Sequence, residues 1–185
     1  MGEIKSTLDL VMEKTRHMNL TQTERNEKRG EEIRKALRGL IQKFRDQVLR
    51  EEQVLDEFNR LEHVEDHPRE RMLLEEVLKQ LRLDDTPESR RAGLELLEFV
   101  CGLNMERLSS IFQAFDTATE KARKEGTQKQ LARLFRDHRI SGSAVIPNLG
   151  ADPDLTDTLN RLHETYEERF EREKARRIAA HDRSN

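Results

Sequence analysis

Two histidines four positions apart come closest, in this sequence, to the spacing of a metal site. The stretch His63-Val64-Glu65-Asp66-His67 would present both imidazoles to one metal ion from one side of a helix. It differs from the metal-binding pattern H-x-x-E-H in having Asp66 in place of the glutamate. Pro68 disfavours helical geometry at His67, and no third ligand follows at a recognisable spacing. We therefore interpret this stretch as a polar helix end, with a metal held by His63 and His67 as the alternative.

The single cysteine, Cys101, excludes an internal disulfide and a zinc site built from cysteines. Its neighbours Val100 and Leu103 are apolar, and burial raises the pKa of a thiol, so we expect a packing residue and not a nucleophile. The glycine-rich patterns that bind phosphates do not occur, and no histidine follows a glutamate at the Glu-x-x-His spacing of di-iron bundles. The sequence therefore predicts a protein that is not an enzyme and holds no cofactor.

Charge is distributed unevenly along the second half of the chain. Residues 121–139 contain seven basic and two acidic residues, a balance of +5, whereas residues 152–173 contain eight acidic and three basic residues, a balance of −5. The basic segment could contact nucleic-acid phosphates, or the two segments could pair as neighbouring helices. We favour pairing because one connection joins them and their balances are equal and opposite. The nucleic-acid alternative would use Lys121, Arg123, Lys124, Lys129, Arg133 and Arg136.

Phe135 lies within the basic segment and is its one aromatic residue. It follows Leu131 and Leu134 at helical spacing, so we expect it in the core and not as a platform for stacking bases.

The connection between the two charged segments, residues 140–151, has no charged residue in a chain that is 38% charged. Connections between helices commonly need about two to eight residues, and this one has about twelve. A large apolar side chain left in water forgoes about 1.5–3 kcal/mol, so its apolar residues should be covered. We predict that Val145, Ile146, Pro147 and Leu149 form a docking element. We favour packing within the molecule or a homodimer, with a foreign protein as the alternative.

Composition favours a long, thin molecule over a thick globule. Of the 185 residues, 34% are hydrophobic and 4% aromatic, which is little material for one spherical core. Leucines recur every three or four positions, as in amphipathic helices, and no stretch alternates as a strand does. The predicted fold class is all-α: an elongated helical bundle with long coiled-coil-like helices and no sheet.

Residues that commonly begin or end helices divide the chain into four predicted parts. These are an N-terminal helix and long amphipathic helix (1–62), a central helical bundle (66–141) whose most buried helix is 86–103, the uncharged connection (142–151) and a C-terminal coiled-coil-like helix (152–185).

Three local patterns set the expected helix boundaries. The 11-residue spacing of Ile33, Phe44 and Leu55 predicts one long, nearly straight helix over residues 33–61, with Val48 in its apolar stripe. Thr21 and Glu24 have the spacing of a capping box, and Asp85-Thr86-Pro87 marks another helix start. Gly126, followed by Thr127 and Gln130, predicts that a helix ends and another begins there.

The stretch GEIKSTLDLVMEKT, residues 2–15, resembles the opening of a set of uncharacterised small helical proteins from anaerobic bacteria. This resemblance implies a bacterial cytoplasmic protein and carries over no catalytic or binding residues. No apolar run approaches the roughly 20 residues needed to cross a bilayer, and the start lacks the pattern of a secretory signal. The net charge of −3 implies no general attraction to nucleic acid or to an anionic membrane.

These observations predict a non-enzymatic helical interaction or scaffold protein in the cytoplasm. We expect it to self-associate as a homo-oligomer, with residues 140–151 as the docking segment. Entry into a larger protein assembly is a further option. One alternative is a nucleic-acid or ribosome-associated regulator that uses the basic helix 121–139. The other is a helical bundle that binds a metal or small molecule.

Overall fold

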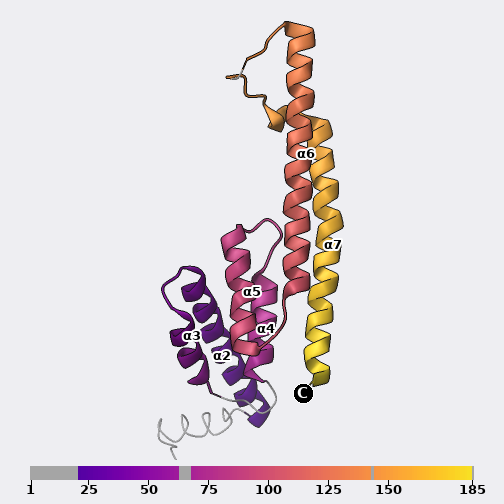
Figure 1. The fold of residues 1–185 in the computed structure, drawn as a ribbon. Helices are drawn as coiled ribbons and strands as arrows, with labels where there is room; N and C mark the ends of the chain where they lie inside the picture. Colours follow the sequence, from indigo (N-terminus) through magenta and orange to yellow (C-terminus); the bar gives the residue numbers. More distant parts are fainter. Residues whose placement is uncertain (1–20, 63–67, 143, 185) are drawn as a thin grey trace, which may run out of the picture.

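The computed structural model describes residues 21–62, 68–142 and 144–184, and within these ranges every regular element is helical. The elements are α2 (Gln22–Arg45), α3 (Glu51–Asn59), α4 (Arg69–Gln80), α5 (Pro87–Cys101), α6 (Glu106–His138), the short 3₁₀ helix η1 (Leu149–Ala151) and α7 (Pro153–Ser184). Helices α2 to α5 gather at one end, and α6 and α7 form a long antiparallel hairpin that extends well beyond them (Figure 1). The prediction of an elongated all-α bundle is confirmed, while the N-terminal helix predicted within residues 1–20 lies outside the described residues.

One hydrophobic cluster holds these helices together. It centres on α4, which contacts α2, α5 and the second half of α7. The apolar residues of this helix and the residue directly after it are all buried: Met72, Leu73, Leu74, Val77, Leu78 and Leu81.

The helix predicted to be most buried, α5, contributes unevenly to this cluster. Leu96 and Leu97 are inaccessible to solvent, whereas Phe99, Val100 and Cys101 are half-buried. The centre of the core therefore lies on α4 as much as on α5.

The helix starts predicted at Thr21 and at Asp85-Thr86-Pro87 are confirmed by their hydrogen bonds. The Glu24 backbone N–H donates to Thr21 Oγ1 at 3.2 Å, and the Glu24 carboxylate accepts from the Thr21 backbone N–H at 2.7 Å. Thr86 caps α5 by accepting from the Ser89 backbone N–H at 3.2 Å. Gly102 ends the same helix with a φ of 64°, a left-handed conformation that glycine adopts without steric cost.

The predicted long helix over residues 33–61 is wrong. The chain turns at residues 46–50, where Gln47 has a φ of 57°, and α3 folds back against α2 and α5. Val48, expected in the apolar stripe, is 67% exposed. The physical reason is the length of the available partners: α4 has 12 residues and α5 has 15, so a straight 29-residue helix would leave its second half in water. Folding back buries Val54 and Phe58 instead.

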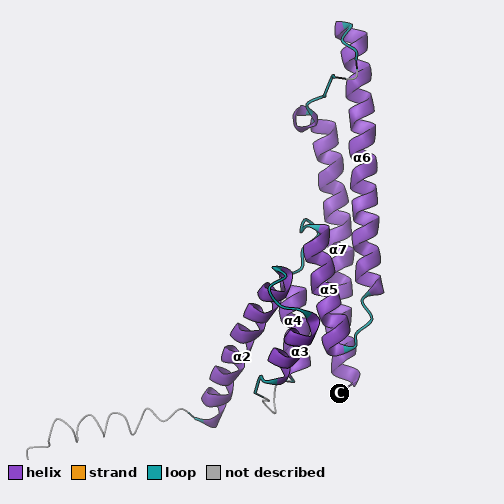
Figure 2. Cartoon of the chain, turned by 60° about the vertical axis from the view of Figure 1, so that its left-hand side comes forward, coloured by secondary structure: helices purple, strands orange, loops and turns teal. Residues whose placement is uncertain are grey.

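The α6–α7 hairpin is joined by an apolar seam. The Phe112 and Phe170 ring centres are 5.0 Å apart, and the Phe115 and Tyr166 ring centres are 5.6 Å apart. These aromatic contacts tie the base of the hairpin to the core, and beyond them α6 and α7 lie side by side without another helix covering them in the described part of the chain (Figures 1 and 2).

The helix end predicted at Gly126 is also wrong, because α6 continues through it for twelve more residues, to His138. The Thr127 hydroxyl, expected to cap a new helix, donates to the Arg123 carbonyl at 2.8 Å within the same helix. Gly126 serves a different purpose, since a Cβ atom there would lie 2.9 Å from Cδ2 of Leu155 on α7. The missing side chain allows the two helices to approach closely.

Alanine at Gly126 is expected to give no gain in stability, whereas alanine at Gly39 should raise the free energy of unfolding by about 1 kcal/mol. Both glycines lie inside helices, where alanine is intrinsically better by about that amount. A Cβ at Gly39 meets no described atom within 4 Å, but at Gly126 it must displace the buried Leu155. Urea denaturation of Gly126→Ala and Gly39→Ala measures the difference. Equal stabilisation of the two variants would contradict the close approach.

Candidate functional site at the hairpin tip

The start of α7 is fixed against α6 by the buried residue Asp152. Its carboxylate accepts hydrogen bonds from Gln130 Nε2 at 2.8 Å and from the Asp154 backbone N–H at 3.1 Å. The Gln130 hydrogen bond, together with backbone N–H groups at the start of α7 and the nearby charge of Arg133, lowers the pKa of Asp152. The carboxylate therefore stays ionised well below neutral pH and keeps the first turn of α7 in place.

Beyond Gln130, α6 extends for about two more turns, past the level at which α7 begins. Helix α6 ends with Arg139 as its C-cap, whose φ is 56°. The chain then returns to η1, which contacts both α6 and α7. Figures 1 and 2 show this connection standing away from the side of α6. The free end of α6 and the returning connection together form the hairpin tip, which comprises the described residues 133–142 and 144–151.

The four predicted docking residues all lie on this tip, but they differ in exposure. Ile146 is 90% exposed, whereas Val145, Pro147 and Leu149 are half-buried. Sequence reasoning missed Ile140, which is 47% exposed.

Phe135 corrects another expectation, since it is 51% exposed and not part of the core. It lies nine residues after Gly126, which is two and a half turns and therefore the opposite side of α6 from the seam. Helical spacing from Leu131 and Leu134 could not show which side of α6 faces α7.

Exposed apolar surface is concentrated at the tip. Four large hydrophobic side chains are strongly exposed among the described residues, and three of them, Phe135, Ile140 and Ile146, are on the tip. The fourth, Val48, lies at the turn between α2 and α3. Several exposed apolar side chains on one part of a molecule are typical of an interaction surface, whereas single exposed apolar residues are common on any protein surface.

Comparisons with protein-family models, curated proteins and solved structures found no match. The function therefore has to be argued from this chain's own residues.

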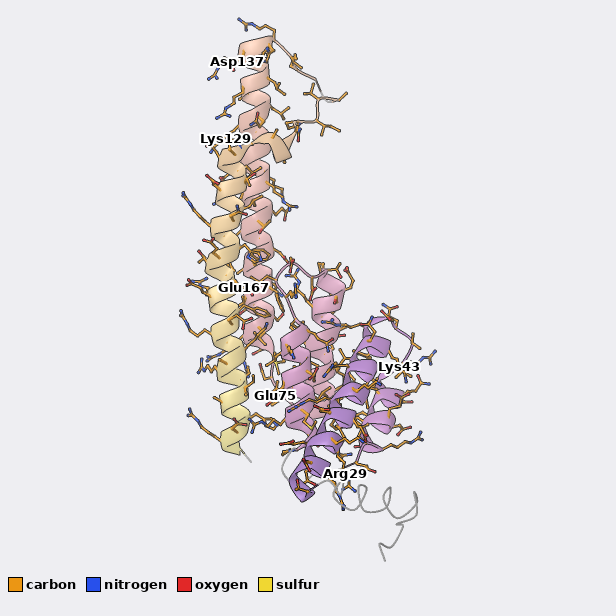
Figure 3. The ribbon with its side chains drawn as sticks, turned by 180° about the vertical axis from the view of Figure 1, so that it is seen from behind. Arg29, Lys43, Glu75, Lys129, Asp137 and Glu167 are labelled. Carbon is orange, nitrogen blue, oxygen red and sulfur yellow. The ribbon has the colours of Figure 1, made fainter. Side chains whose placement is uncertain are left out.

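Arginines also lie on the tip, and one of them contacts an exposed apolar side chain. Arg139 has its guanidinium carbon 5.8 Å from the centre of the Phe135 ring. Arg136 pairs with Asp137, with Nε and Oδ1 2.7 Å apart, and this hydrogen bond lowers the pKa of Asp137. Figure 3 places Asp137 at the end of the hairpin farthest from α2 to α5. The tip therefore combines exposed apolar side chains with basic side chains.

The basic and acidic segments do lie side by side in the hairpin, but direct ion pairs do not explain their pairing. Between the described parts of α6 and α7 the one ion pair joins Arg133 to Asp154, at 3.8 Å, and both side chains are exposed. Acidic residues such as Asp157 and Glu164 lie close to half a turn away from Leu155, which faces Gly126 in the seam. Their charges point away from α6, so the apolar seam holds the helices together.

The six basic residues of the nucleic-acid alternative are exposed on α6. Lys124 pairs with Glu120 of the same helix at 2.6 Å, while Arg136 pairs with Asp137 and Arg133 with Asp154, as above. The remaining three form no ion pair with the described residues: Lys121, Arg123 and Lys129.

The candidate metal ligands His63 and His67 lie outside the described residues. Elsewhere, in residues 21–62, 68–142 and 144–184, no three histidine, cysteine or acidic side chains are grouped so that they could hold a metal ion. None of the helices described combines the length and apolar character that crossing a bilayer requires.

The thiol of Cys101 is expected to react about a thousandfold more slowly in the folded protein than in denaturant at pH 8. Burial, aided by the charge of Glu70, raises its pKa to about 12, so the thiolate fraction falls by that order. Because the folded-state pKa is the higher one, Cys101 should also favour unfolding as pH rises from about 9 towards 12. Labelling with a thiol reagent in buffer and in urea checks the rate, with Cys101→Ser as the control. Equal rates in both solutions would show that the thiol is accessible.

Proposed function

We propose that this protein is a non-enzymatic helical interaction protein that binds another protein through the hairpin tip. The observation that carries the proposal is the position of Ile146, 90% exposed at the end of a hairpin that extends away from the core. Together with Phe135 and Ile140 it leaves uncovered apolar surface whose burial would contribute about 1.5–3 kcal/mol for each large side chain. An arm that carries such a surface away from the body of the molecule suits contact with a partner.

Self-association and a bacterial cytoplasmic location are part of the same proposal. Self-association is supported by the uncovered upper half of the hairpin, where α6 and α7 have only each other and η1 as described neighbours. The location is supported by the resemblance of residues 2–15, which lie outside the described residues.

The proposal is tested by replacing Ile146 with aspartate and comparing it with Val48→Asp. Both substitutions place a charge on an exposed apolar position, but only Ile146 lies on the tip. We expect Ile146→Asp to weaken partner binding at least tenfold in pull-down and titration experiments, while Val48→Asp and both thermal melts remain close to wild type. If Ile146→Asp keeps every partner and the same mass in light scattering, the tip is only a connector.

The nucleic-acid alternative is favoured by one observation, the three exposed basic residues of α6 that form no ion pair with the described residues. Gel shifts at two salt concentrations separate it from the main proposal, because phosphate contacts weaken steeply with salt. Binding that is lost at high salt and in the combined variant Lys121→Gln, Arg123→Gln and Lys129→Gln would support it. For the metal alternative, metal analysis of purified protein with and without His63→Ala and His67→Ala is decisive.

A further inference from the structure

A groove of about 400 Å³ lies between α5 and α6, near the base of the hairpin. Apolar side chains of Pro87, Leu94 and Phe112 form part of its lining, and Glu95 and Glu98 are exposed on its α5 side. The groove is therefore partly apolar and bordered by carboxylates.

One of the two arginines that line the groove is already paired. Arg90, whose side chain is 5% exposed, donates to both carboxylate oxygens of Asp116 at 2.9 and 2.7 Å and to the Leu83 carbonyl at 3.2 Å. Its guanidinium carbon lies 4.8 Å from the centre of the Phe112 ring. Arg90 and Asp116 neutralise each other. The other charged residues that line the groove are Arg91, Glu95 and Glu98, so the net charge of the groove is −1.

The hairpin tip has the opposite character. Arg136 is compensated by Asp137 and Arg133 by Asp154, which leaves the positive charge of Arg139 next to the exposed Phe135, on the same tip as the exposed Ile140 and Ile146. An apolar projection with a net positive charge matches, in both respects, a partly apolar groove with a net negative charge.

We infer that this groove receives the hairpin tip of a second copy of the chain, with Ile146 as the apolar anchor and Arg139 beside Glu95 and Glu98. A tip cannot reach the groove of its own chain, because the helix from Gln113 in the groove to His138 at the tip is about 38 Å long. The contact joins two different surfaces, so it is head-to-tail and builds a ring or an open chain. This inference rests on the proposed function of the tip and names its partner.

A disulfide trap tests the contact directly. In a Cys101→Ser background, one variant carries Ile146→Cys on the tip and the other carries Gln113→Cys in the exposed border of the groove. After mixing and mild oxidation, we expect the mixed disulfide to form at least tenfold faster than with Glu164→Cys, an exposed control on the outer side of α7. Equal rates for the Gln113 and Glu164 variants would overturn the inference.

Charge exchange provides a second, independent test. Light scattering over a range of concentrations should show reduced association for Arg139→Glu and for Glu95→Lys, and recovery in the chain that carries both changes. Thermal melts of the three variants confirm that each is folded. If the combined variant associates no better than the single ones, the predicted pairing of tip and groove is wrong.

These experiments distinguish the inference from the proposed function. If the purified protein stays monomeric and forms no selective disulfide, but Ile146→Asp still loses a foreign partner, the tip binds proteins and the groove is not its site. If Ile146→Asp changes neither mass nor partner, both proposals fail.

Discussion

Replacing Phe170 with alanine is expected to lower the free energy of unfolding by about 3–5 kcal/mol, because it removes a large side chain that has no exposure to solvent. The Phe170 ring lies 5.0 Å from that of Phe112 on α6, and the Lys174 ammonium is 4.2 Å from its centre. Lys174 in turn donates to the Leu81 carbonyl at 2.9 Å, just after α4. Phe170 therefore joins α7 both to α6 and to the core.

The matched control is Phe135→Ala, which removes the same side chain from an exposed position on the tip. We expect that variant to stay within about 0.5 kcal/mol of the wild type. Urea denaturation followed by circular dichroism measures both, with Phe170→Leu expected to lose less than Phe170→Ala. If Phe170→Ala and Phe135→Ala have equal effects, the base of the hairpin is not anchored by Phe170.

Replacing Arg69 with methionine is expected to lower the free energy of unfolding by about 2–4 kcal/mol, because it removes hydrogen bonds made by a charged group. Arg69 Nη1 donates to three carbonyls at the end of α3: those of Phe58 at 3.2 Å, Asn59 at 3.0 Å and Leu61 at 3.0 Å. The guanidinium carbon also lies 5.3 Å from the centre of the Phe58 ring. The last carbonyls of a helix have no partner within it, so this side chain at the start of α4 satisfies the end of α3.

Methionine keeps much of the apolar stem of Arg69, so the loss reports mainly on the hydrogen bonds. Arg91→Met, at an exposed position on α5, is the control and should change stability by less than about 0.5 kcal/mol. Amide hydrogen exchange should increase in α3 before it increases in α6. A uniform increase in both helices would argue against a local role for Arg69.

Features that depend on neighbouring residues were predictable from the sequence. The fold class follows from leucines at helical spacing, and the caps at Thr21 and Thr86 follow from short-range hydrogen-bonding patterns. The apolar residues of α4 recur at helical spacing and are all buried.

Features that depend on distant partners were not predictable in this way. The turn at residues 46–50 follows from the short lengths of α4 and α5, which the stripe in residues 33–61 does not encode. Gly126 resembles a helix end until Leu155, 29 positions later, is known to lie against it. Likewise, Arg69 gains its role only because the end of α3 is brought next to it.

For the candidate site, the sequence indicated the uncharged segment but did not show which of its side chains are exposed to solvent. Ile146 is exposed while its neighbours are half-buried, and this depends on how the connection returns along α6. Phe135 joins the surface because it lies on the side of α6 opposite the seam, and Ile140 joins it because it directly follows the end of α6.

The uninterrupted course of α6 has a mechanical consequence. Its 33 residues make a rod about 50 Å long, stiffened along most of its length by α7. A partner bound at the hairpin tip would therefore be held at a fixed distance from the α2–α5 bundle. The number of helical residues in α6 sets this distance. Removing seven residues from each arm, which nearly preserves the orientation of both faces, would shorten this spacer by about 10 Å.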